Sequence, residues 1–141
     1  MKLRLTLLSL TLTLFSLCAY SQNFDFDRSE QLRKEFETRQ PTKVEYDYMI
    51  EECEKFVDRF ISVTRDIKKL PTLDERKEAA TNYNKRTGND YNIYMFYLRR
   101  LQEGLGNDTL TSTQAIEVDK LLSDNKYINR MFTKYRSRYE L

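Results

Sequence analysis

An apolar residue recurs at every third or fourth position from residue 43 to residue 70, and this pattern constrains the fold more than any other feature. The stripe consists of Met49, Cys53, Phe56, Val57, Phe60, Ile61, Thr64, Ile67 and Leu70. This spacing is the period of an α-helix with one buried face. Acidic side chains crowd its first half, and Lys68 and Lys69 close it, in the order that suits the helix dipole. The sequence therefore predicts a long amphipathic helix that forms part of a core.

A repeated start signal divides the chain into further helices. In a capping box, an N-cap oxygen and a Glu or Gln three residues later satisfy free backbone N–H groups. The pairs are Asp27/Glu30, Thr42/Glu45, Thr72/Glu75 and Thr111/Gln114. Pro41, Pro71 and Gly88 are expected to end helices, and Asp90 to cap one. The predicted helices cover about 28–40, 43–70, 73–86 and 91–104, followed by a last helical region with a break near Ser123, Asp124 and Asn125.

Composition agrees with an all-helical fold. No segment shows the sustained alternation of a strand, and the chain has only three glycines and two prolines. The 91–104 segment is apolar around most of its circumference, so we expect it at the centre. The predicted fold is a single all-α domain over residues 22–141, a small irregular four- to five-helix bundle organised around the 43–70 and 91–104 helices.

The first 21 residues have the anatomy of a secretory signal peptide. Lys2 and Arg4 form a positive start, residues 5–17 are apolar and uncharged, and the segment ends with small residues at the −3 and −1 positions of a cleavage site. The apolar stretch is shorter than the roughly 20 residues that span a bilayer. We therefore expect residues 1–21 to be removed and residues 22–141 to form the exported domain.

Export places the domain in the periplasm or outside the cell, with membrane contact only through the signal segment if it stays uncleaved. Lipid attachment at Cys18 is disfavoured, because Leu17 stands where a lipoprotein signal has a small residue. The Ser-Gln at the expected cut resembles signals of exported Bacteroidetes proteins. Cys53 is then the one remaining cysteine, which excludes an internal disulfide. Its place on the apolar stripe predicts a buried side chain in preference to a reactive thiol or a covalent dimer.

Charge and residue types exclude several function classes. The chain has 24 basic and 22 acidic residues, and the signal removes Lys2 and Arg4 with no acidic residue, so the exported domain is neutral and we expect no nucleic-acid partner. The absence of histidine removes the usual general base and metal ligand. The glycines fit no phosphate loop. We therefore predict no catalytic residue, no cofactor and no metal, and a protein that is not an enzyme.

A carboxylate-based hydrolase is the third-ranked alternative. Such an enzyme would use two acids that face one cleft. The adjacent pairs Glu51/Glu52 and Asp74/Glu75 are the candidates, but adjacent residues of a helix do not face each other. These acids are therefore expected to lie on solvated helix faces.

Ten tyrosines suggest a binding surface, because tyrosine offers a large amphipathic contact at low entropic cost. The candidate partner-binding residues are Tyr46, Tyr48, Tyr94, Tyr127, Arg130 and Tyr135. For most tyrosines the favoured interpretation is that they lie at core edges with the hydroxyl toward water. Basic and aromatic residues interleave between Lys126 and Arg138, and the favoured explanation is that basic residues suit a helix C-terminus. If this stretch binds a partner, an acidic protein or a membrane surface is expected.

The segment Leu110-Thr111-Ser112-Thr113-Gln114 is similar to the Leu-Thr-x-x-Gln signature of periplasmic chaperones of the Spy and CpxP type. That resemblance implies an exported, all-helical protein that cradles unfolding clients without ATP. The family commonly has two copies of the signature, and this chain has one.

A second short pattern lies just before this segment. Asn107-Asp108-Thr109 fits an N-glycosylation acceptor, and Asp108-Thr109-Leu110 resembles the O-glycosylation signal of exported Bacteroidetes proteins. Thr109 is therefore a candidate glycosylation site.

Taken together, these features predict an exported, non-catalytic helical protein that binds a protein partner in the cell envelope. The sequence leaves the identity of that partner and the oligomeric state open. The Spy/CpxP-like chaperone is the alternative. A dedicated partner predicts a fixed stoichiometry, whereas a chaperone predicts a concave surface with broad, weak binding.

Overall fold

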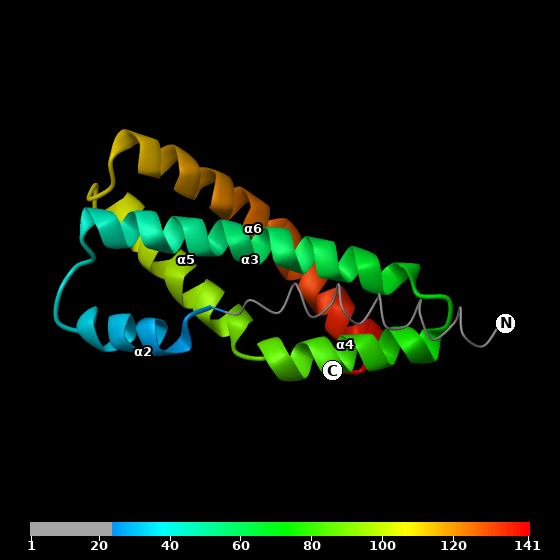
Figure 1. The fold of residues 1–141 in the computed structure, drawn as a ribbon. Coiled ribbons are helices and arrows are strands. Elements are labelled where there is room, and N and C mark those ends of the chain that lie inside the picture. The colour runs from blue at the N-terminus through cyan, green and yellow to red at the C-terminus, as the bar shows by residue number, and fades with distance from the viewer. Residues whose placement is uncertain (1–23) are drawn as a thin grey trace, which may run out of the picture.

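The computed structural model describes residues 24–141, and in this part of the chain five α-helices and no strand are present (Figure 1). The helices are α2 (Phe26–Glu35), α3 (Lys43–Lys69), α4 (Leu73–Thr87), α5 (Asp90–Gly106) and α6 (Ser112–Tyr139). The predicted all-helical bundle is therefore confirmed. The predicted signal peptide over residues 1–21, including Cys18, lies outside the described residues.

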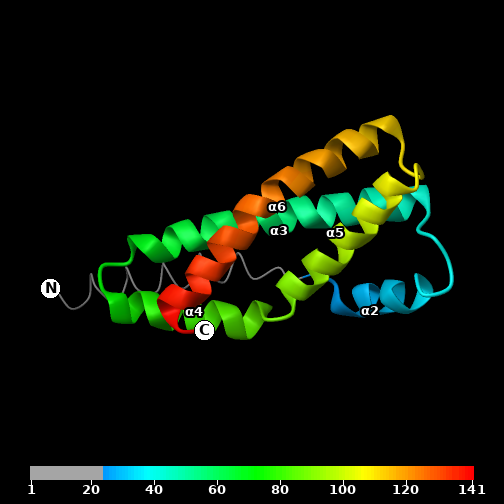
Figure 2. The same ribbon diagram turned by 180° about the vertical axis from the view of Figure 1, so that it is seen from behind.

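Helix α3 runs the length of the molecule, and α4, α5 and α6 all pack against it. The view from behind (Figure 2) shows α5 and α6 on the same side of α3, while α2 and α4 lie at opposite ends. Helices α5 and α6 also pack against each other. The central three-helix layer is therefore α3, α5 and α6, and its outer ends are covered by the two shorter helices.

The core lies where the stripe of α3 meets α5 and α6. Cys53, Phe56 and Phe60 are buried, as the stripe predicted. The ring of Phe56 stacks on Tyr94 of α5 with centroids 4.5 Å apart, and the central position expected for α5 is confirmed by the full burial of Tyr94 and Tyr97. Aromatic pairs of this kind add specific geometry to the burial of apolar area.

The capping boxes at Thr42, Thr72 and Thr111 are confirmed, each with reciprocal side-chain and backbone bonds. The box predicted at Asp27 is wrong. Asp25 caps α2 instead and accepts a hydrogen bond from the Arg28 backbone N–H at 2.9 Å. One turn of sequence contains several acidic residues, and the earlier one has the extended backbone that an N-cap needs.

Two helix ends also differ from the prediction. Helix α2 stops at Glu35, not at 40, because Phe36 turns into the core and Arg39 bonds to Glu45 across the following turn. Asp90 does not cap α5: it is the first residue of that helix and is buried, and the N-cap is Asn89.

Helix α6 continues through Ser123, Asp124 and Asn125, where a break was predicted. These residues have weak helix propensity, but tertiary contacts outweigh it. Asn125 Oδ1 accepts a hydrogen bond from the Tyr94 hydroxyl at 3.1 Å, and Leu121 and Ile128 on either side are buried. Packing therefore holds this segment helical.

A close approach of α3 and α5 occurs at Gly104. A Cβ atom at this position would lie 2.9 Å from Cε1 of the buried Tyr46 ring, whereas a Cβ at Gly106 would meet no atom within 4 Å. We expect Gly104→Ala to be about 2 kcal/mol less stable than Gly106→Ala, because both gain helix propensity and only the first overpacks the core. Urea unfolding measures the difference. Equal stability of the two variants would show that the ring moves away freely.

Candidate functional site

Three of the tyrosines predicted to bind a partner are buried. Tyr46, Tyr94 and Tyr135 are 2%, 0% and 6% exposed. Their hydroxyl groups bond within the fold: Tyr46 with Thr109 Oγ1 at 3.0 Å, Tyr94 to Asn125 Oδ1 at 3.1 Å, and Tyr135 to the Ala80 carbonyl at 3.1 Å. This corrects their expected place on a surface, because each ring fills the core while its hydroxyl is satisfied by a neighbouring element. These three residues no longer belong to a candidate contact surface.

The other three candidates have solvent access. Tyr127 is 58% exposed, and Arg130 is exposed on the same helix, α6. Tyr48 lies elsewhere, on α3, where its ring meets Tyr97 edge-on with centroids 6.0 Å apart and is partly buried. The candidate site is therefore limited to α6, and Tyr127 and Arg130 lie at its centre.

Further exposed residues extend this surface along α6. Positions three, four or seven apart lie on one face of a helix. The α6 stripe is formed by the exposed residues Ile116, Lys120, Tyr127, Arg130, Lys134 and Arg138. Between residues 125 and 139 the chain contains no acidic residue. Within residues 24–141, none of the four cations of the stripe forms an ion pair.

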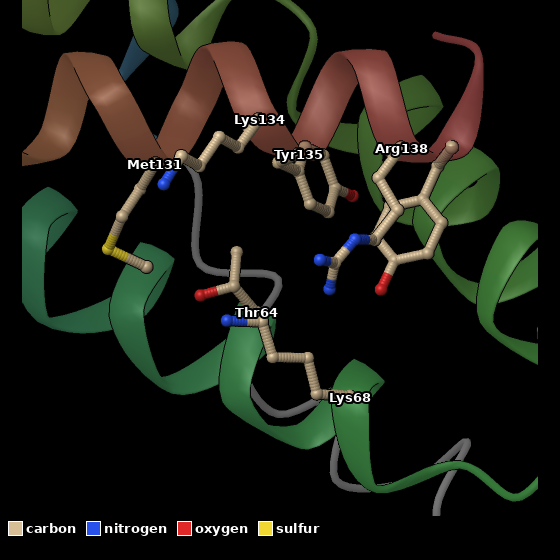
Figure 3. Close-up of a pocket in the computed structure, with 7 residues that line it drawn as sticks. Thr64, Lys68, Met131, Lys134, Tyr135 and Arg138 are labelled. Carbon is tan, nitrogen blue, oxygen red and sulfur yellow. The ribbon is translucent and has the colours of Figure 1, made fainter.

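A small pocket opens at the C-terminal end of the stripe, between α3 and α6 (Figure 3). Its volume is about 80 Å³. It is lined by Thr64, Lys68, Met131, Lys134, Tyr135, Arg138 and Tyr139. In Figure 3 the guanidinium of Arg138 extends from α6 toward α3, where Thr64 and Lys68 line the opposite side. We call this feature the α3–α6 pocket.

One residue that lines this pocket has a polar atom without a partner in the described part of the chain. Tyr139 is 4% exposed, its hydroxyl is buried, and no hydrogen-bond partner is present for it among the described residues. The neighbouring Tyr135 packs edge-on against it with centroids 5.3 Å apart, but the Tyr135 hydroxyl bonds to α4 instead. A buried hydroxyl without a partner is uncommon and calls for a physical reason.

Sequence reasoning named the basic C-terminal stretch but missed the pocket. Lys134 and Arg138 are four residues apart, which places them on one face of α6. The sequence therefore predicted that Lys134 and Arg138 share a face. Lys68 lines the same pocket only because the end of α3 packs beside the end of α6. The sequence gave Tyr139 only as one of the aromatic residues of this stretch, since the state of its hydroxyl follows from the packing around it.

The remaining reactive groups are held within the fold. Cys53 is fully buried, as predicted, and burial raises the pKa of its thiol, so the thiolate needed for nucleophilic chemistry is disfavoured. Among residues 24–141, no group of three His, Cys, Asp or Glu side chains could hold a metal ion. The acidic pairs considered for hydrolysis have local partners: Lys55 bonds to Glu51 and Glu52, and Glu75 belongs to a capping box.

Asp90 is the acidic residue whose environment is most unusual. Burial at the start of α5 raises its pKa to about 6, against the opposing effects of Arg59 and of a hydrogen bond from the Phe24 backbone. Desolvation disfavours the charged form of a carboxyl group. Burial therefore favours the neutral form of Asp90 more than in an ordinary aspartate, but Asp90 is not among the residues that line the α3–α6 pocket.

Thr109 lies in the exposed loop between α5 and α6, as expected for a glycosylation site. Its hydroxyl donates a hydrogen bond to the Gly104 carbonyl at 3.1 Å and lies 3.0 Å from the Tyr46 hydroxyl. A sugar on Oγ1 would replace the proton that forms the first of these bonds. Glycosylation at Thr109 stays a prediction, and it would weaken this tie between the loop and α5.

The signature shared with the chaperones has a structural use in this fold. Thr111 caps α6 with Gln114, and the Gln114 amide also bonds to the Lys43 carbonyl at 3.1 Å and to Asp47 Oδ1 at 2.6 Å. The motif therefore starts α6 and ties it to the first turn of α3.

In the described part of the chain, no helix has both the length and the low polarity needed to cross a membrane. Comparison with known proteins finds no family model, no curated protein and no solved structure that matches this chain. A functional assignment therefore rests on the residues of this chain alone.

Proposed function

We propose that this chain is an exported, non-catalytic binding protein that docks an acidic protein surface on the α6 stripe. The observation that carries the proposal is the row of four exposed cations around the exposed Tyr127, which have no ion-pair partner among the described residues. Arginine and tyrosine are enriched in the energetic centres of protein interfaces. Unpaired cations also steer an acidic partner toward the surface.

The rest of the molecule supports a local interaction in preference to a global one. Basic and acidic residues of residues 22–141 balance, so the stripe is a local excess of positive charge on a neutral protein. Non-specific binding to nucleic acid needs many phosphate contacts and a strongly basic footprint. A short stripe on one helix fits a complementary acidic patch of similar length.

The chaperone alternative has less support from the surface. The large apolar residues with most exposure are Phe26, Val44, Leu73, Ile116 and Tyr127. They are distributed over α2, α3, α4 and α6, whereas a client-binding cradle needs a contiguous apolar patch. A dedicated partner is therefore the favoured function.

The proposal is tested by crosslinked pull-down from native cell-envelope extract. The wild-type chain is expected to capture one acidic partner in a fixed ratio. The double variant Arg130→Glu/Lys134→Glu is expected to lose at least tenfold in capture, because it reverses the charge at the centre of the stripe. The affinity of the purified pair should fall with added NaCl, since exposed charges are screened by salt.

A matched control separates the stripe from net charge. Arg65→Glu/Arg99→Glu changes the net charge equally at exposed positions of α3 and α5 and should leave capture intact. Equal capture by the wild type and the stripe variant would contradict the proposal. Capture of many unfolded envelope proteins would instead support the chaperone.

A further inference from the structure

We propose that the α3–α6 pocket binds a phosphoryl group, as inorganic phosphate or as a phosphate monoester. This site is separate from the docking function of the α6 stripe, although Lys134 and Arg138 contribute to both. The pocket is lined by cations from two helices and by Tyr139, whose buried hydroxyl has no partner among the described residues. Both features indicate an anionic ligand, which would supply the negative charge and the hydrogen-bond acceptor that the described side chains do not provide.

The charge of the pocket is uncompensated. Lys68, Lys134 and Arg138 form no ion pair within the described residues. Two nearby acids are engaged elsewhere: Asp66 with Lys69 at 3.0 Å and Glu140 with Lys77 at 2.9 Å. Three positive side chains around one opening favour an anion with more than one negative charge.

Tyr139 lines this pocket, and its hydroxyl is a buried donor without a partner among the described residues. A buried donor left unpaired costs free energy. A ligand oxygen in the pocket would accept the bond that the fold does not provide. This bond would explain why the position holds a tyrosine, although phenylalanine would fill nearly the same space.

The residues that line the pocket fit a phosphoryl group. Lys68 comes from α3, whereas Lys134, Arg138 and Tyr139 come from α6, so the donors of the lining belong to two helices. A single water needs about 10–15 Å³, and a pocket of about 80 Å³ has room for several such groups. Arginine and lysine are both common phosphate ligands.

The test is a titration of the full-length protein, followed by NMR or calorimetry, with inorganic phosphate and with glycerol 3-phosphate. Saturable binding of either one is expected for the wild type. Tighter binding of inorganic phosphate would identify a free anion as the ligand, and tighter binding of glycerol 3-phosphate would identify an ester carried by a larger molecule. Absence of saturable binding for both would overturn the proposal.

Tyr139→Phe is the decisive variant, because it removes only the unpartnered hydroxyl. The variant should be as stable as the wild type or more stable without ligand, and its phosphate affinity should fall about fivefold. Tyr127→Phe is the matched control on the exposed side of α6 and should bind phosphate normally. An unchanged phosphate affinity of Tyr139→Phe would overturn the assignment of this hydroxyl to a ligand.

A second pair of variants distinguishes this site from the docking surface. Arg138→Gln should weaken phosphate binding at least tenfold, whereas Arg130→Gln, which lies on the stripe but does not line the pocket, should leave it intact. Equal losses for the two would show diffuse attraction to a basic surface and would contradict a built site. A pull-down that captures no partner would count against the docking proposal only, because the phosphate titration tests the pocket independently.

Discussion

Replacing Phe56 or Phe60 with alanine is expected to lower the free energy of unfolding by about 3–5 kcal/mol. Both side chains are buried where α3 meets its neighbours. Phe56 stacks on Tyr94 of α5, and Phe60 packs on Phe132 and Tyr135 of α6 with centroids 5.9 Å away in both cases. Each truncation removes the contact area and leaves a cavity between two helices that cannot close fully.

Chemical denaturation of the full-length chain measures both losses. Phe26→Ala is the matched control, because Phe26 lies at the start of α2 and is 51% exposed. Its truncation should cost less than about 1 kcal/mol. A loss below about 1 kcal/mol for both Phe56 and Phe60 would show that the stripe of α3 is not the core.

Replacing Glu45 with glutamine is expected to cost about 2 kcal/mol at neutral pH. The Glu45 side chain accepts hydrogen bonds at 2.7 and 2.8 Å from both terminal nitrogens of Arg39, which pins the turn after α2 to the start of α3. It also accepts a bond from the Thr42 backbone N–H at 2.8 Å. Glutamine retains the capping bond and removes the charge, so the loss reports the ion pair.

The pH dependence of this loss has a defined sign. Hydrogen bonding from Arg39 lowers the pKa of Glu45 to about 2, against about 4.3 for an unfolded chain. A carboxyl group with a lowered pKa adds stability that is complete above the unfolded pKa and disappears as the pH falls through the folded value. The difference between the wild type and Glu45→Gln should therefore be largest above about pH 5 and shrink steadily toward pH 2.

Glu75→Gln is the control, because Glu75 occupies the same capping position in the exposed box of α4, where its carboxylate bonds to Thr72. We expect a loss below about 0.5 kcal/mol. If the two variants behaved alike, the capping geometry and not the Arg39 pair would explain the effect of Glu45.

Local signals predicted the helices well because they depend on residues three or four positions apart. The boxes at Thr42, Thr72 and Thr111 begin helices as expected. Most of the predicted stripe is buried, but Ile61 and Leu70 are only partly buried. At the start of α2 two acidic residues, Asp25 and Asp27, are both suitable N-caps by residue type. The backbone path decided that Asp25 is the N-cap. The prediction of a helix break near Asn125 was wrong, because a hydrogen bond from Tyr94 of α5 holds that segment in α6.

The candidate site was likewise predicted in part from the sequence and decided in part by tertiary packing. The basic, aromatic C-terminal segment was visible in the sequence, since the side chains of one helix face follow from spacing alone. Which tyrosines are exposed was decided by tertiary packing: Tyr127 faces solvent, while Tyr46, Tyr94 and Tyr135 are enclosed by other helices. The presence of Lys68 and Arg138 in one pocket was also decided by tertiary packing, because residues far apart in sequence share a pocket only once α3 and α6 have packed.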